Sequence, residues 1–235
     1  MTTTRDGCTV ELYALLPPAG EPEVIHQAIP AGATVLDLGT GAGRIALPLA
    51  ALGHPVTGVD NSAEMLAHVR NAETVLADIE TLRLGRRFDA VLLASNLLNT
   101  PETALRRAFL ATAAYHADGP VIVQWTPPAW FDTMDAGTRQ IGPVTVTTKD
   151  IVRDGDLLSA TAQYDTADQH WEHAFTALRL STSDVEEELA AVGLRLERWL
   201  TEDQSWFTAT VREPNQRSSV SANPSALGSS DAQAT

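Results

Sequence analysis

The chain has little basic charge, a single cysteine and no long apolar run, and each shortage excludes a class of protein. Its 235 residues carry 16 lysines and arginines against 30 acidic residues, a formal net charge of −14. Nucleic-acid binding needs clustered positive charge, so we expect no nucleic-acid partner. One cysteine, Cys8, excludes an intrachain disulfide framework and a cysteine metal site.

The sequence also lacks targeting and membrane features. The N-terminal stretch from Met1 to Asp6 has no apolar segment of the kind found in a signal peptide. No apolar run approaches membrane-spanning length. No histidines and acids are spaced as a metal site requires, so no metal is predicted. We therefore expect a cytoplasmic protein with one α/β domain and no membrane partner.

The most informative stretch runs from Val35 to Asp60. It opens with the short apolar run of a buried parallel strand, and three glycines follow, namely Gly39, Gly41 and Gly43. Glycine permits positive φ and lets the backbone approach a ligand closely. After a helix, Asp60 ends a second strand, where a carboxylate can bind the hydroxyls of a ribose. The stretch predicts a nucleoside-containing cofactor.

The type of cofactor follows from the residues around this turn. A dinucleotide-binding turn would have a third glycine at the position of Arg44. Asp37 followed by the three alternating glycines instead resembles the first motif of the class I S-adenosylmethionine-dependent methyltransferases. The resemblance implies that Asp37 helps to hold the amine of S-adenosylmethionine. It also implies that the turn from Gly39 to Arg44, including Thr40, contacts this cofactor.

The segment from Gly58 to Leu66 resembles the second motif of the same family. The resemblance implies that Asp60 binds the ribose hydroxyls, that Met65 lines the adenine, and that Asn61 belongs to the cofactor site. Asn61 or Ser62 is expected to cap the next helix.

Two more segments resemble the third and fourth strands of that family. In the stretch from Val75 to Ile79, Asp78 would accept the adenine amino group and Ile79 would donate its backbone N–H to the ring. The stretch from Phe88 to Asn96 would end at the reaction site, where Ser95 would join the cofactor-binding residues. Four motifs in the right order and spacing make the resemblance specific.

The acceptor site is expected where the fourth strand ends. The Asn-Pro-Pro-Tyr type signature of enzymes that methylate planar nitrogens of nucleic acids and proteins is absent, since Ser-Asn-Leu-Leu stands there. That absence favours a small-molecule methyl acceptor. The predicted substrate-binding residues are Tyr13, Asn96, Asn99, Trp125 and Trp130.

A general base is predicted on a polar strand near the end of the cap. His170, Trp171, Glu172 and His173 are consecutive, and alternation along a strand puts His173 on the face of Trp171. We therefore predict His173 as the catalytic base, on a strand that enters the core sheet. His116 and His26 are expected at the surface.

The fold class predicted is α/β: a doubly wound, seven-stranded, mostly parallel sheet of the Rossmann-like methyltransferase type, with a small antiparallel cap after the fifth strand. The expected divisions are an N-terminal lid over 1–30, a cofactor-binding core over 31–126, a cap over 127–170, completion of the core sheet over 171–212 and a disordered tail over 213–235.

Two local features of the second half are also predicted. The stretch from Thr126 to Phe131 is expected to be irregular. Ser183 and Glu186 match a capping box that would begin the last helix.

The function predicted is transfer of a methyl group from S-adenosylmethionine to nitrogen or oxygen of a metabolite, by in-line displacement. One alternative is a repurposed member of the family, a cyclase or a non-catalytic binder that retains the cofactor. An NAD-dependent oxidoreductase is disfavoured by Arg44. The oligomeric state stays open between a monomer and a homodimer.

Overall fold

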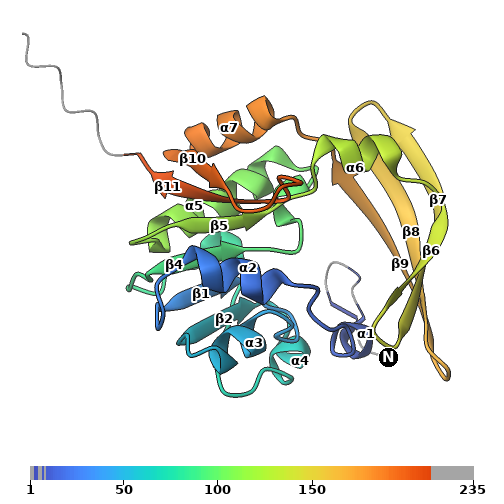
Figure 1. Ribbon diagram of the computed structural model, residues 1–235, viewed down its shortest axis with the longest axis horizontal. Helices are drawn as coiled ribbons and strands as arrows, with labels where there is room; N and C mark the ends of the chain where they lie inside the picture. Colours follow the sequence, from blue (N-terminus) through green and yellow to red (C-terminus); the bar gives the residue numbers. More distant parts are fainter. Residues whose placement is uncertain (1–2, 5–6, 8, 213–235) are drawn as a thin grey trace, which may run out of the picture.

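The computed structural model describes residues 3–4, 7 and 9–212. Two sheets lie beside each other, a seven-stranded one and a four-stranded one (Figure 1). Cys8 and the predicted disordered tail over 213–235 lie outside the described residues.

The seven-stranded sheet has the order β10-β11-β5-β4-β1-β2-β3. Strands β1 to β5 are parallel to one another, and β11 runs antiparallel to both β5 and β10. This topology confirms the predicted Rossmann-like, mostly parallel sheet. The strands are β1 (Val35–Leu38), β2 (Val56–Asp60), β3 (Glu73–Leu76), β4 (Ala90–Leu93), β5 (Val121–Gln124), β10 (Leu194–Trp199) and β11 (Trp206–Val211).

Helices cover both faces of this sheet because its central strands are apolar on both sides. One face packs against α2 (Glu21–Ala28) and α3 (Ala46–Ala51), and the other against α5 (Thr103–His116) and α7 (Thr182–Ala191). Three shorter helices are the α-helix α4 (Ala63–Leu66) and the 3₁₀ helices η1 (Ile79–Thr81) and η2 (Leu97–Asn99). Within the described residues, no helix has the length and apolar character needed to cross a membrane.

The second sheet is antiparallel throughout and has the order β6-β7-β8-β9. Its strands are β6 (Gly137–Ile141), β7 (Val144–Asp154), β8 (Leu157–Asp165) and β9 (His170–Leu178). We call it the cap sheet. The prediction that residues from 171 onward complete the core sheet is wrong for β9, which pairs with β8 along its whole length. Alternating polarity suits a strand with one solvent face, whereas the core strands are continuous apolar runs.

Two short helices lie between the sheets, α1 (Val10–Tyr13) and α6 (Pro128–Thr133) (Figure 1). The prediction of an irregular stretch from Thr126 to Phe131 is therefore wrong. Pro128 occupies the start of α6, where its missing N–H costs nothing. Phe131 packs against Leu158 on the cap sheet and joins α6 to it.

Two further local predictions need correction. The capping box of α7 is formed by Ser181 and Asp184, two residues before the predicted pair. His116 is fully buried rather than at the surface. Its Nδ1 lies 2.8 Å from the Thr112 carbonyl oxygen, and its Nε2 accepts the Leu84 N–H at 3.1 Å. Burial lowers the pKa of His116, because the charged imidazolium is poorly solvated there.

Candidate functional site

The glycine turn lies at the carboxyl end of β1, beside the ends of β2 and β4. Gly39, Gly41 and Gly43 all have positive φ, at 76°, 55° and 85°. A Cβ on Gly39 would stand 3.1 Å from the Leu97 side chain, whereas one on Gly41 would meet nothing within 4 Å. The turn is therefore packed on one side by the loop after β4 and open at Gly41. In open α/β sheets, ligands bind at this kind of edge.

Asp60 ties the glycine turn to the second strand. One carboxylate oxygen accepts the Gly41 N–H at 2.8 Å, and the other accepts the Ser62 N–H at 2.9 Å. A carboxylate oxygen has two acceptor positions, so each retains one for a ligand hydroxyl. Asp60 thus stands at the predicted place, held from both sides by backbone.

The next strand end is linked to the same edge. Asn61 donates its side-chain N–H to Asp78 at 3.1 Å. Of the two predicted caps, Ser62 caps α4, since its hydroxyl accepts the Met65 N–H. Met65 is buried against Ala42 of the glycine turn. The predicted adenine-side residues are therefore brought together, with Ile79 buried directly after Asp78 in η1.

Asp37 is the buried acid of the site, with a side chain that accepts a hydrogen bond from the Thr40 hydroxyl at 2.7 Å. Burial raises the pKa of Asp37 to about 6, against the lowering effects of Thr40 and Arg44. Thr40 is itself packed over Gly58, where a Cβ would lie 2.8 Å from its methyl group. The acid is thus held in place, and its charge is costly unless a cation approaches.

The Arg44 side chain is engaged with α2. It forms an ion pair with Glu21 at the start of α2, and Glu21 also accepts the Ala19 N–H. Desolvation of Glu21 is outweighed by these partners, so its pKa is lowered. The Arg44 side chain therefore fastens α2 to the glycine turn, and a contact of Arg44 with the cofactor stays a prediction.

Tyr13 of α1 lies between the two halves of the molecule. It packs against Met65 and Ala42 on the core side, and against a cap cluster that contains Trp171. The segment predicted as a lid is therefore in contact with both the glycine turn and the cap sheet. The segment ends in α2, and Pro22 sits in the first turn of that helix.

Two predicted substrate residues have structural roles instead. Asn99 is buried, and its amide bonds to the Thr126 N–H at 2.7 Å and to the Leu178 carbonyl at 2.9 Å. It therefore fastens the cap sheet to the core. Trp125 is buried against Trp199, and its indole N–H bonds to the Gln204 carbonyl. Trp130 is 37% exposed on α6, and its role stays a prediction.

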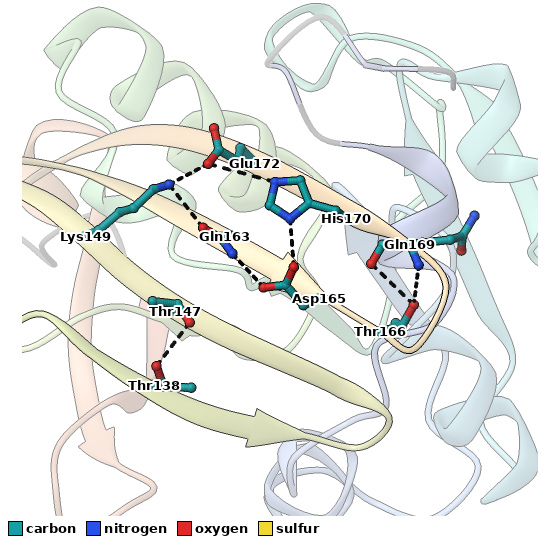
Figure 2. A network of polar contacts seen from close by, with 9 residues as sticks. All are labelled: Thr138, Thr147, Lys149, Gln163, Asp165, Thr166, Gln169, His170 and Glu172. Atoms are coloured by element: carbon teal, nitrogen blue, oxygen red, sulfur yellow. Dashed lines mark hydrogen bonds and ion pairs between the residues drawn. The ribbon is translucent and has the colours of Figure 1, made fainter.

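His173 and His170 occupy opposite faces of β9. His173 is half-buried on the inner face, with its Nδ1 3.4 Å from the Gly7 carbonyl oxygen. His170 lies 2.7 Å from Asp165, within a surface network that includes Glu172 and Lys149 (Figure 2). This separation agrees with the predicted alternation and leaves His173 as the histidine that faces the N-terminal segment.

The loop after β4 contains two consecutive residues in the left-handed region. Ser95 has φ of 56° and Asn96 has φ of 59°, and both are exposed. The Ser95 N–H donates to the side-chain oxygen of Gln124 at 2.8 Å. Sequence reasoning missed Gln124. A polar residue that closes an otherwise apolar strand is the signal that could have found it.

The described residues contain no group of three or more histidine, cysteine or acidic side chains placed to hold a metal ion.

Part of the core is similar in sequence to a known family. Residues 35–118, from the start of β1 to the end of α5, match the family model described as a methyltransferase domain. Over these residues the chain is similar to a methyltransferase domain. The match contains the glycine turn, Asp60 and the loop after β4, while the cap sheet follows the matched residues. A comparison with curated proteins finds no match.

Solved structures with the same fold include three methyltransferases. The CcbJ methyltransferase of Streptomyces caelestis is 22% identical, with 84% of this chain and 91% of that chain covered and a TM-score of 0.69. The sugar N-methyltransferase KedS8 of Streptoalloteichus is 21% identical, with 91% and 96% covered and a TM-score of 0.67. The amino pentose methyltransferase CalS10 of Micromonospora echinaspora, solved with S-adenosylmethionine, is 22% identical, with 87% and 92% covered and a TM-score of 0.65. At these identities the likeness shows the fold.

Proposed function

We propose that this protein transfers a methyl group from S-adenosylmethionine to a nitrogen or oxygen atom of a small-molecule acceptor. The observation that carries the proposal is the glycine turn, open at Gly41 and bound by the Asp60 carboxylate, within a matched methyltransferase domain. Two of the structural neighbours named above are a sugar N-methyltransferase and an amino pentose methyltransferase, which supports a small molecule as the acceptor.

The donor groups at this edge fit the proposed cofactor. Asp60 has acceptor positions left for ribose hydroxyls, and Asp37 offers a buried negative charge for an amine. Arg44, which stands where a dinucleotide-binding turn has its third glycine, is engaged with Glu21. When bound, the cofactor would supply a methyl group on a positively charged sulfur. A nucleophile can attack this methyl carbon without further activation of the methyl group.

The protein's own part is to place the acceptor and to remove its proton. Holding two reactants in line can contribute about 7–11 kcal/mol of the barrier. We propose that α1 and the cap sheet enclose the acceptor, with Tyr13, Trp130 and Asn96 among its contacts. His173 is the proposed base: donation from Nδ1 to the Gly7 carbonyl would leave Nε2 to accept a proton.

Cofactor binding should weaken as the pH falls below about 6. Asp37 has its pKa raised to about 6, so in the free protein it is protonated at lower pH and ionised above. A cation beside it favours the ionised form, so binding at pH 6 should release a proton. Titration calorimetry in buffers of different ionisation enthalpy measures that release.

The Asp37→Asn variant provides the control for this pH dependence. Its affinity should be lower at pH 7.5 and should change little between pH 5 and pH 7.5. The ionisation of Asp37 has the opposite effect on the stability of the free protein. Because the pKa of Asp37 is raised in the folded state, its contribution to stability is lost as the pH rises toward about 6. An affinity of wild type that is constant from pH 5 to 7 would contradict the proposed role.

The proposal as a whole is tested with two ligands and one screen. S-adenosylhomocysteine should raise the melting temperature of the protein, and NAD should leave it unchanged. Amine, phenol and sugar acceptors are then incubated with cofactor carrying a labelled methyl group. Transfer of the label to an acceptor would establish that the protein is a methyltransferase. Stabilisation by NAD alone would instead indicate an oxidoreductase.

A cofactor-retaining cyclase or binder is the alternative within the same fold. It would bind S-adenosylhomocysteine equally well but would transfer no label to any acceptor. A homodimer stays a prediction.

A further inference from the structure

The loop that follows β4 has an unfavourable backbone conformation. Ser95 and Asn96 are consecutive and both have φ near 60°. A residue with a Cβ pays an energetic cost in this region, although asparagine tolerates it better than serine does. Such conformations persist only where the surrounding structure imposes them, and they gather at functional sites.

The side chain of Gln124 contacts the backbone of Ser95. Its side-chain oxygen accepts the Ser95 N–H at 2.8 Å. Strands β4 and β5 are parallel neighbours, with Leu93 opposite Val123. Gln124 therefore ends β5 directly beside the start of the loop that follows β4. Gln124 also lines an open hollow of about 540 Å³, together with Glu21, Thr201, Asp203 and Trp206.

The far end of this loop packs on the glycine turn. Leu97 follows Asn96, and its side chain packs onto Gly39, 3.1 Å from where a Cβ would stand. The loop is further held by the Asn99 N–H, which donates to the Asn96 carbonyl at 2.8 Å. A change at Ser95 is therefore expected to displace Asn96, while the packing of Leu97 on Gly39 keeps the glycine turn in place.

We propose that Gln124 is a positioning residue for methyl transfer, which holds Ser95 and Asn96 in the left-handed conformation beside the reacting atoms. The inference rests on the proposed function, because it assumes that the reaction takes place at this sheet edge. Gln124 acts through Ser95 and touches neither reactant. Its loss should therefore affect the rate of transfer more than the binding of the cofactor.

The test compares two substitutions of nearly equal length. Gln124→Met removes the acceptor oxygen, and Gln124→Glu retains one. With the best acceptor from the screen, Gln124→Met should lower kcat about 10- to 100-fold, since small misplacements of reactants have effects of this size. Gln124→Glu should recover most of the rate. The dissociation constant of S-adenosylhomocysteine should stay within about twofold of wild type in both.

A second measurement does not depend on the acceptor. The Ser95 amide is exposed but hydrogen-bonded, so its hydrogen exchange should be slow in wild type and fast in Gln124→Met. Adding Ser95→Gly to Gln124→Met should restore part of the rate of methyl transfer, because glycine adopts the left-handed conformation without the steric cost. Gln163→Met, which alters a glutamine in the surface network of Figure 2, is the matched control and should behave as wild type.

The outcomes separate the inference from the proposed function. Wild type that fails to bind S-adenosylhomocysteine would refute the proposed function. Wild type that binds it, together with a Gln124→Met variant of unchanged kcat or unchanged Ser95 exchange, would refute the inference alone. A parallel loss of cofactor affinity in Gln124→Met would also overturn it, since that result indicates general damage to the site.

Discussion

Replacing Asp60 by alanine is expected to weaken the binding of S-adenosylhomocysteine about 100-fold. The carboxylate accepts the N–H groups of Gly41 and Ser62, and we propose that it also binds the ribose. Hydrogen bonds to a charged group contribute about 1.5–3 kcal/mol each, and every 1.4 kcal/mol is a factor of ten in affinity. Losing the ribose contacts alone therefore accounts for an effect of this size, and loosening of the turn adds to it.

Calorimetry with purified variants measures this effect directly. Asp60→Asn keeps one acceptor oxygen but places an N–H₂ group against a backbone donor, so its affinity should fall between alanine and wild type. Asp165→Ala is the matched control, because Asp165 is an aspartate of the cap sheet that contacts His170 and Gln163. The ribose role of Asp60 is refuted if Asp60→Ala binds the ligand as tightly as Asp165→Ala does.

The parts of the fold that were predicted correctly depend on local chemistry. The glycine turn needs positive φ at three positions close in sequence, and the carboxylate of Asp60 follows a buried strand directly. Such requirements are visible within about 30 residues, because a βαβ unit is a local structure. The order of the strands then follows from the restricted handedness of parallel connections.

The parts that were predicted wrongly depend on contacts between distant residues. Asn99 bonds to Leu178, 79 positions later in the chain, and Trp125 bonds to Gln204, also 79 positions later. Their residue types suit either an acceptor pocket or a buried structural contact. Only the tertiary fold distinguishes the two, and only the tertiary fold shows that Glu21 is the partner of Arg44.

The assignment of β9 shows a different limit. Alternation along the strand correctly separates His173 from His170, because the side-chain period of a strand is two. That period says which side chains share a face, but it does not say which strand is the neighbour. β9 continues the antiparallel series after β8, whereas the prediction placed its residues in the core sheet.

Replacing His173 by alanine should reduce kcat by about 100- to 10,000-fold, the usual contribution of a general base. Its Nδ1 is 3.4 Å from the Gly7 carbonyl oxygen, and donation from Nδ1 to that oxygen would leave Nε2 to accept a proton. The effect should be greatest with hydroxyl acceptors, since their proton must leave during transfer. Binding of S-adenosylhomocysteine should be unchanged, because the inner face of β9 belongs to the cap rather than to the glycine turn.

His170→Ala is the matched control for this experiment, since it removes the same side chain from the same strand but from the outer face (Figure 2). It should leave kcat at the wild-type value. His173→Gln adds a second comparison, because glutamine can still donate to the Gly7 carbonyl but cannot accept a proton at neutral pH. If His173→Gln retains wild-type turnover of a hydroxyl acceptor, His173 holds the N-terminal segment in place and the proton leaves by another route.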